Sequence, residues 1–319
     1  MGEDKPFNKL KKQFKRMNKY IIILFLTLIS CKEEPKKVNK NEKNKLKITQ
    51  TSDYSLIKTQ NSKGLLILFP CFPCDSKNTL SEFKIKEISV KNGISILAMN
   101  LNKLLYLKQT EKQELAEKLS KIIQENNLSK ENIFIGGFSS GGNVSLLISD
   151  YLVRNKSLIK PKGVFIVDSP IDLLALYKTS KKNLKRNFSE VSVQESKWIV
   201  KMLENEFGNP KNGISKYEKN APYTSESKNI DNLKGLEKLK IRLYTEPDLE
   251  WWGKQRKNNL EDLNAYYIQD LSKKLEVEFG SNNIELINTQ NRGYRANGER
   301  HPHSWSIVDE KDLISWILE

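Results

Sequence analysis

The residues best suited to chemistry in this chain surround one serine. Gly137-Phe138-Ser139-Ser140-Gly141 fits the pattern G-x-S-x-G, and Ser139 is the only serine in that frame. The pentapeptide directly follows one apolar run and directly precedes another with helical spacing, so we expect Ser139 at a sharp turn between a strand and a helix. The flanking glycines permit a tight turn and a close approach of the helix to the strand. The pattern predicts a nucleophilic serine, and the alternative is a glycine-rich turn whose serine only caps the helix.

A serine hydroxyl needs a neighbouring base to become a good nucleophile. The chain has only two histidines, His301 and His303, and both fall between the last predicted strand and the final helix. We expect His303 to be the base because it leads directly into that helix, with His301 as the alternative. Alternatively, both histidines are exposed loop residues with no catalytic role.

A carboxylate must orient the imidazole of the base. Asp248 lies on the loop just beyond a predicted strand at 240–244 and is the expected acid. Glu246 on the same loop and Asp168, which ends the preceding strand, are the alternatives. Each of the three could instead cap a helix or form a surface ion pair.

The elements that position these residues follow an alternating pattern from about residue 52 onward. Continuous apolar runs are typical of strands buried on both faces, and they occupy residues 64–69, 94–99, 132–136, 163–167, 240–244 and 283–287. Strands separated by helices predict an α/β fold with a mostly parallel central sheet and helices on both faces. A long polar, helical segment at about 171–238 interrupts the alternation and predicts a cap inserted between two core strands.

Together these features resemble the α/β-hydrolase superfamily of serine esterases and peptidases, over about residues 60–319. The order Ser139, Asp248, His303 matches the nucleophile–acid–base order of that family. Residues 245–248, Thr-Glu-Pro-Asp, resemble its common G-x-x-D element. The resemblance implies an α/β-hydrolase fold and a Ser-His-Asp triad that works through an acyl-enzyme.

The same resemblance implies an oxyanion hole built from two backbone N–H groups. One belongs to Ser140, the residue after the nucleophile. The other comes from the loop after the first apolar strand, where many members carry His-Gly-x-Gly but this chain has Pro70 and Cys71. The alignment indicates Phe72 as the second donor, because Pro73 has no N–H.

Cys71 and Cys74 in that loop also raise a rival function. A C-x-x-C pair after an apolar strand, with a proline before the second cysteine, is typical of thioredoxin-like oxidoreductases. The chain continues 245 residues beyond Cys74, well past a thioredoxin domain. In an oxidising compartment a local disulfide that stiffens the oxyanion loop is the simpler role.

The amino terminus resembles the signal peptide of a bacterial lipoprotein. A ten-residue apolar run at 20–29 follows a lysine-rich stretch and is too short to span a bilayer. It ends in Leu28-Ile29-Ser30-Cys31, which resembles a lipobox and implies a signal peptide over 1–30, lipid on Cys31 and membrane anchoring. Lys32 after the cysteine suggests the outer membrane, and Lys32-Glu33-Glu34 resembles a surface-export tag.

Charge is concentrated outside the predicted domain. The formal net charge is +15, of which residues 1–30 contribute +5 and residues 32–47 contribute +4. Residues 31–50 are therefore expected to form a solvated tether, followed by the domain at 51–319. No basic cluster with interleaved aromatics points to nucleic acid.

The sequence thus predicts a lipid-anchored serine hydrolase that cleaves an ester or related acyl bond, with no cofactor and no metal. Two histidines two residues apart are poor zinc ligands without supporting cysteines. Ester, peptide and acetylated-sugar substrates all stay open, because the cap at 171–238 would set the specificity. A binding lipoprotein that keeps the fold without the chemistry is the alternative of a different class.

Overall fold

A single eight-stranded sheet organises the part of the chain that the computed structural model describes, residues 46–101 and 104–319. Its strand order is β1-β2-β4-β3-β5-β6-β7-β8. Every pairing from β4 to β8 is parallel, whereas β1 and β2 pair antiparallel at one edge. The strands are β1 (Thr49–Gln50), β2 (Tyr54–Ile57), β3 (Gly64–Phe69), β4 (Ile94–Met99), β5 (Ile133–Phe138), β6 (Pro161–Val167), β7 (Lys240–Thr245) and β8 (Ile284–Asn288). The predicted mostly parallel sheet is confirmed.

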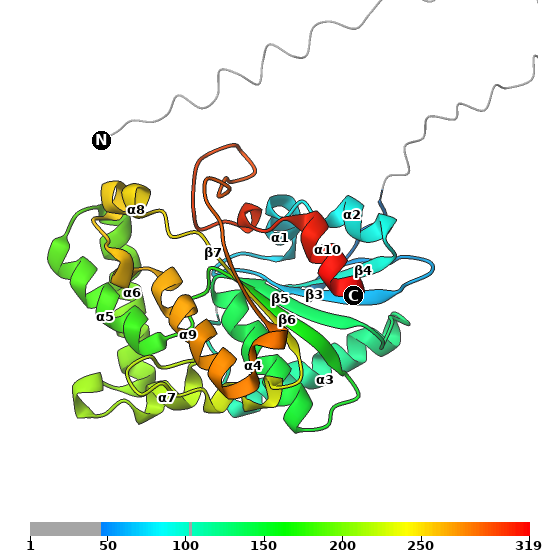
Figure 1. Ribbon diagram of the computed structural model, residues 1–319, viewed down its shortest axis with the longest axis horizontal. Coiled ribbons are helices and arrows are strands. Elements are labelled where there is room, and N and C mark those ends of the chain that lie inside the picture. Colours follow the sequence, from blue (N-terminus) through cyan, green and yellow to red (C-terminus); the bar gives the residue numbers. More distant parts are fainter. Residues whose placement is uncertain (1–45, 102–103) are drawn as a thin grey trace, which may run out of the picture. The chain divides into compact units, whose positions relative to one another are not determined.

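Helices cover both faces of the sheet (Figure 1). One face packs against α3, α4 and α9, and the other packs against α1, α2 and α10. The helices are α1 (Ser76–Glu82), α2 (Lys86–Lys91), α3 (Gln109–Glu125), α4 (Ser140–Arg154), α5 (Leu173–Arg186), α6 (Glu190–Phe207), α7 (Ser215–Asn220), α8 (Leu249–Arg256), α9 (Asn264–Phe279) and α10 (Glu310–Leu318). This two-sided cover requires the strands to be apolar on both faces.

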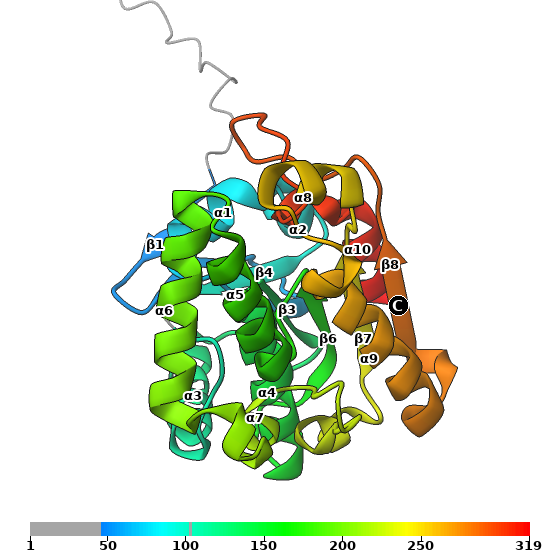
Figure 2. The same ribbon diagram turned by 90° about the vertical axis from the view of Figure 1, so that its left-hand side faces the viewer.

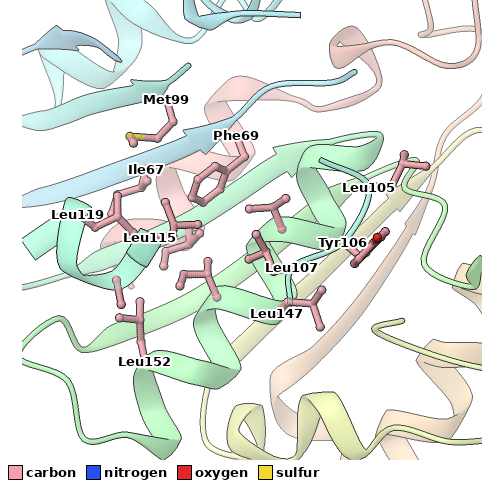
Figure 3. Packing of buried hydrophobic residues seen from close by; sticks show 14 of the residues in the cluster. Ile67, Phe69, Met99, Leu105, Tyr106, Leu107, Leu115, Leu119, Leu147 and Leu152 are labelled. Carbon is pink, nitrogen blue, oxygen red and sulfur yellow. The ribbon is translucent and has the colours of Figure 1, made fainter. Parts of the chain in front are cut away.

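The strand β3 shows how the apolar runs meet that requirement. Leu65, Ile67 and Phe69 enter the core beneath α3 and α4 (Figure 3), whereas Leu66 and Leu68 enter the core on the opposite face. All five side chains are fully buried. Burying one such side chain stabilises the fold by roughly 1.5–3 kcal/mol. The continuous apolar run therefore fixes β3 at the centre of the sheet.

The edge strands depart from the prediction. Each apolar run yields a strand: the runs at 64–69 and 94–99 match β3 and β4, and the other four differ from their strands by one or two residues, but β1 and β2 were not predicted. β1 pairs with β2 through Thr49 and Gln50, which fall within the tether predicted over 31–50. Both strands are short, and β1 is exposed. They therefore lack the long apolar runs from which the six other strands were predicted.

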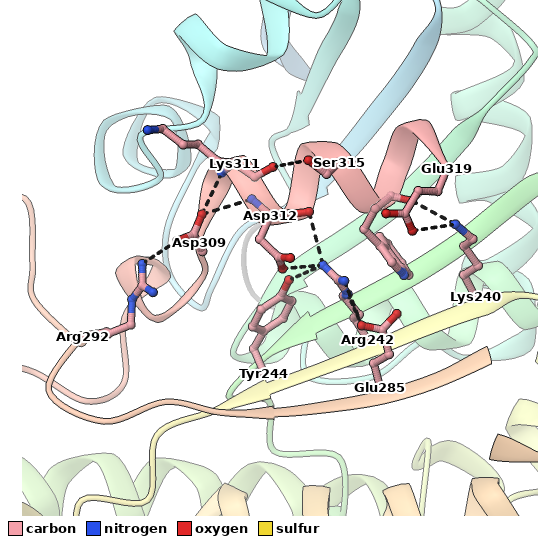
Figure 4. Close-up of polar contacts among 11 residues, drawn as sticks. Lys240, Arg242, Tyr244, Glu285, Arg292, Asp309, Lys311, Asp312, Ser315 and Glu319 are labelled. Atoms are coloured by element: carbon pink, nitrogen blue, oxygen red, sulfur yellow. Dashed lines mark hydrogen bonds and ion pairs between the residues drawn. The ribbon is translucent and has the colours of Figure 1, made fainter. Parts of the chain in front are cut away.

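The carboxyl-terminal helix α10 is held to the sheet by one buried cation (Figure 4). Arg242 on β7 pairs with Asp312 on α10 at 2.7 Å and with Glu285 on β8 at 2.8 Å. Its guanidinium also lies 4.9 Å from the ring centre of Trp316. A buried cation is tolerated only when it is paired. Because the partners of Arg242 lie on β8 and α10, the ion pairs hold α10 against the sheet, and the loop before α10 ends there.

The segment between β6 and β7 forms the predicted helical insertion. It carries α5, α6 and α7, and Figure 2 shows α5 and α6 side by side. We call α5 and α6 the cap helices. The predicted signal peptide, lipobox and Cys31 lie outside the described residues. None of the helices that the structure describes is long and apolar enough to cross a membrane.

Candidate active site

Ser139 occupies the sharp turn that its glycine-flanked pattern predicts. It is the single residue between β5 and α4. Its backbone has φ 55° and ψ −126°, a conformation that residues other than glycine rarely adopt. A Cβ on Gly137 would lie 2.2 Å from the backbone of Gly141, and a Cβ on Gly141 would lie 2.3 Å from the carbonyl oxygen of Phe69. The backbone N–H of Ser139 donates to the carbonyl of Val167 at 2.9 Å. The helix and the strand thus approach so closely at this turn that only glycine fits at positions 137 and 141.

The partner of His303 is Asp168. Nδ1 of His303 lies 2.6 Å from Oδ2 of Asp168, and the two side chains are 20% and 8% exposed. Asp168 directly follows β6, and its other carboxylate oxygen accepts a hydrogen bond from Thr245 at 3.1 Å. Its backbone is also held, because its carbonyl accepts from the Asn264 amide at 2.9 Å. The ring of Phe138, next to the serine, packs on His303 at 4.5 Å between centres.

The expectation that Asp248 orients the base is therefore corrected. Oδ1 of Asp248 caps α8 by accepting from the Trp251 N–H at 2.9 Å, and Oδ2 pairs with Arg300 at 2.5 Å. The physical reason is the position of the strand ends in the sheet: the loop after β7 leads to α8, while the loop after β6 begins with Asp168 beside His303. The alternative acid Asp168 was the right choice for this contact.

The second alternative acid, Glu246, forms hydrogen bonds and an ion pair that hold a loop in place. Its carboxylate accepts from the Thr289 hydroxyl at 2.8 Å and from the backbone N–H groups of Arg292 and Gly293 at 3.0 and 3.1 Å. It also pairs with Arg300 at 2.6 Å, and its side chain is 1% exposed. Glu246 thus holds the two ends of residues 289–303, the loop that carries both histidines; we call it the base loop.

His301, the alternative base, lines the same cavity but contacts no carboxylate among the residues that the structure describes. Its backbone N–H donates to the Gly293 carbonyl at 2.9 Å, and its ring packs on Trp251 at 4.8 Å. Burial, with the positive charge of Arg295, lowers the pKa of His301 to about 3. The ring is therefore neutral at ordinary pH and lies beside His303, 6.2 Å away between ring centres.

Both expected oxyanion donors lie in the wall of the same cavity. Ser140 begins α4, where the first N–H groups of a helix have no partner within the helix. Phe72 sits in the loop closed by the Cys71–Cys74 disulfide, and its ring stacks on Trp198 of the cap helix α6 at 4.4 Å. Free backbone N–H groups at such positions can stabilise a developing oxyanion.

These groups meet in one cavity of about 630 Å³. Ser139, Asp168, His303 and the disulfide loop line it together with residues of the cap helices and α8. The apolar part of the wall includes Leu105, Pro170, Leu176, Trp198, Ile199, Trp252 and Leu263. Its charged groups include Glu195, Arg256 and Arg295, which sequence reasoning did not single out because nothing in their local sequence marks them. No group of three or more His, Cys, Asp or Glu side chains in the described ranges is placed to hold a metal ion.

Comparisons with known proteins locate this architecture among solved structures. The sequence matches no protein-family model and no curated protein. Its structure is similar to fungal esterases from Rhizomucor miehei, with a TM-score of 0.54 and 14% identity over 83% of this chain and 77% of that one. It is also similar to an esterase/lipase from an uncultured bacterium, with a TM-score of 0.51 and 14% identity over 85% of this chain and 84% of that one. The chain has the α/β-hydrolase fold.

Proposed function

We propose that the protein is a serine hydrolase that cleaves an ester or related acyl bond. The observation that carries the proposal is the hydrogen bond between His303 and Asp168, which line the same cavity as Ser139. A strained serine, an imidazole held by a buried carboxylate, and free backbone N–H groups are the parts that acyl transfer requires. The fold shared with esterases is consistent with this chemistry.

In the proposed mechanism, Oγ of Ser139 attacks the acyl carbonyl carbon while Nε2 of His303 takes the hydroxyl proton. The N–H groups of Phe72 and Ser140 stabilise the resulting oxyanion, and collapse breaks the bond to the leaving alcohol, which receives the proton from His303. Water then attacks the acyl-enzyme, again with His303 as base, releasing the carboxylic acid and restoring Ser139. Asp168 holds the ring in the tautomer that leaves Nε2 free and stabilises the imidazolium.

The substrate proposed is a small molecule whose acyl part fits an apolar wall. The cavity is in the size range of small-molecule sites and buries several aromatic and aliphatic side chains beside the reacting groups. Esters fit this description, and peptides or acetylated sugars with an apolar group fit it as well. The proposal involves no cofactor and no nucleic acid.

The disulfide has a role within this proposal that does not require redox catalysis. It closes the loop that carries Phe72, and Cys71 is 7% exposed in the core beneath that loop. A constrained loop keeps an N–H group aimed at the oxyanion position, which is where preorganisation is most useful. A thiol–disulfide oxidoreductase would leave the elbow at Ser139 and the Asp168–His303 pair without a purpose.

We also propose that the protein is anchored to the bacterial envelope, at the outer membrane, by lipid on Cys31. The support is the lipobox at residues 28–31 and the lysine that follows it. Metabolic labelling with a fatty-acid analogue should modify the full chain and fail for Cys31→Ser. Fractionation that places both forms in the same soluble fraction would contradict the anchor.

The test of the hydrolase is covalent labelling with a fluorophosphonate, with the labelled peptide identified by mass spectrometry. We expect the label on Ser139 and its loss in Ser139→Ala, because only an activated serine reacts with this probe. Ser140→Ala is the matched control, since its side-chain hydroxyl has no role in the mechanism. A folded protein that takes up no label would overturn the proposed function.

A further inference from the structure

Most of the charged side chains that line the active-site cavity have a partner of opposite charge. Glu246 pairs with Arg300, Asp262 with Arg186 and Lys182, and Glu195 with Arg256, while Asp168 lies against the imidazole of His303. Arg295 also lines the cavity, and within residues 46–101 and 104–319 its guanidinium forms no ion pair. Arg295 is therefore a cation in the cavity lining with which an anion from outside could pair.

The backbone of Arg295 is held in place by the turn that it begins. Its N–H donates to the Glu299 carbonyl at 2.8 Å, and its carbonyl accepts from Gly298 at 2.9 Å. The next residue, Ala296, donates to Glu82 of α1 at 2.9 Å. A side chain on a fixed backbone loses less freedom when it binds a ligand, so Arg295 is well suited to recognition.

Arg295 lies in the hairpin of the base loop that also holds His301. Backbone hydrogen bonds join Arg295 to Glu299 and Gly293 to His301, with the bridge between Tyr294 and Arg300 between them. His301 in turn lies beside His303, and Nδ1 of His301 is buried without a hydrogen-bond partner in the described chain. The charge of Arg295 also contributes to the lowered pKa of His301. One unpaired cation and an imidazole with an unused nitrogen thus lie on the loop that carries the proposed base.

This position identifies the part of the substrate that would meet Arg295. The base must protonate the leaving oxygen, so the leaving group departs beside His303 and the acyl part stays over Ser139. We propose that Arg295 binds a carboxylate on the leaving group, so that the preferred substrates are esters of hydroxycarboxylic acids. The inference rests on the proposed hydrolase function and adds the chemical class of the leaving group. A guanidinium suits this role because it pairs with a carboxylate through two parallel hydrogen bonds.

The kinetic test compares 4-acetoxybenzoate with its methyl ester, which share the acetyl-enzyme and differ in the charge of the leaving group. We expect kcat/KM to favour the charged ester, and Arg295→Gln to lower the charged-to-neutral ratio about tenfold. Arg292→Gln is the matched control on the same loop, because its side chain pairs with Asp309 outside the cavity. An unchanged ratio in Arg295→Gln would overturn the inference.

A binding measurement separates this inference from the proposed function. Calorimetric titration of the product 4-hydroxybenzoate into Ser139→Ala needs no turnover, and Arg295→Gln in that background should weaken binding about tenfold. Equal affinity with and without Arg295 would overturn the anion site even if the enzyme is an active esterase. Absence of fluorophosphonate labelling, with intact binding through Arg295, would instead reject the hydrolase and keep the site.

Discussion

Oδ2 of Asp168 lies 2.6 Å from Nδ1 of His303, although 135 residues separate them in the chain. The contact joins the end of β6 to the base loop, and Thr245 and Asn264 hold the aspartate from either side. Because the parallel strands end at one edge of the sheet, residues that follow different strands meet there. This relationship selects one acid from the three that the sequence offered.

Asp168→Asn should remove most of the activity without unfolding the protein. An amide in place of the carboxylate keeps the shape but no longer selects the tautomer or stabilises the imidazolium, so we expect kcat to fall by about 10³–10⁴. Steady-state kinetics on an activated ester such as 4-nitrophenyl acetate measures this loss. Asp248→Asn is the control: asparagine caps a helix as well as aspartate, and kcat should stay within a few-fold. A larger loss in Asp248→Asn than in Asp168→Asn would contradict the assignment.

Glu246→Gln should destabilise the protein and displace the base. The variant leaves Asp248 as the remaining carboxylate partner of Arg300 and weakens the buried hydrogen bonds to residues 289–293, so we expect a loss of about 2 kcal/mol in the free energy of unfolding. Denaturant titration measures the loss, and kcat should fall with it because the base loop carries His303. Glu299→Gln, an exposed position on the same loop, should stay within about 0.5 kcal/mol of wild type. Similar stability for both variants would contradict the role given to Glu246.

Gly141→Ala should disrupt the turn at Ser139. The added Cβ would lie 2.3 Å from the carbonyl oxygen of Phe69 and 2.5 Å from that of Pro70, so α4 must move away from the sheet. Overpacking of this kind costs about 1–3 kcal/mol, and thermal unfolding together with the fluorophosphonate labelling rate should both report it. Gly253→Ala in α8 is the matched control, because its nearest neighbour would be 3.8 Å away. That variant should gain stability, since alanine favours a helix.

His301 should make stability depend on pH below neutrality. Burial first, then the charge of Arg295, lowers its pKa from 6.5 to about 3 in the folded protein. Between these two pKa values the unfolded chain binds the proton more readily than the folded protein does. The contribution of the unprotonated His301 to the free energy of unfolding is therefore complete above pH 6.5. It is lost as the pH falls toward 3, by up to about 1.4 kcal/mol per pH unit. The difference in melting temperature between pH 7 and pH 4.5 should therefore be smaller in His301→Gln than in wild type. An equal difference would show that His301 is protonated as easily in the folded state.

The central strands and the turn at Ser139 could be predicted from the residues alone. Continuous apolar runs predicted the central strands because a strand covered on both faces must be apolar throughout, as Leu65 to Phe69 are. The G-x-S-x-G pattern predicted the turn at Ser139 because backbone crowding there excludes side chains, a local constraint written in neighbouring residues. The chain has only two histidines, both in one short segment, so the prediction of a base was confined to His301 and His303.

The folded structure is needed to say which carboxylate contacts His303 and which charges line the cavity. Asp168, Glu246 and Asp248 each follow a strand, and their order along the chain favoured Asp248, whereas the contact with His303 is made by Asp168. Their contacts depend on where β6, β7 and β8 end in the sheet, and on which cations, such as Arg300, the base loop brings to them. The lack of an ion-pair partner for Arg295 among the described residues is of the same kind, because it is a property of the assembled cavity and leaves no mark in the residues around it.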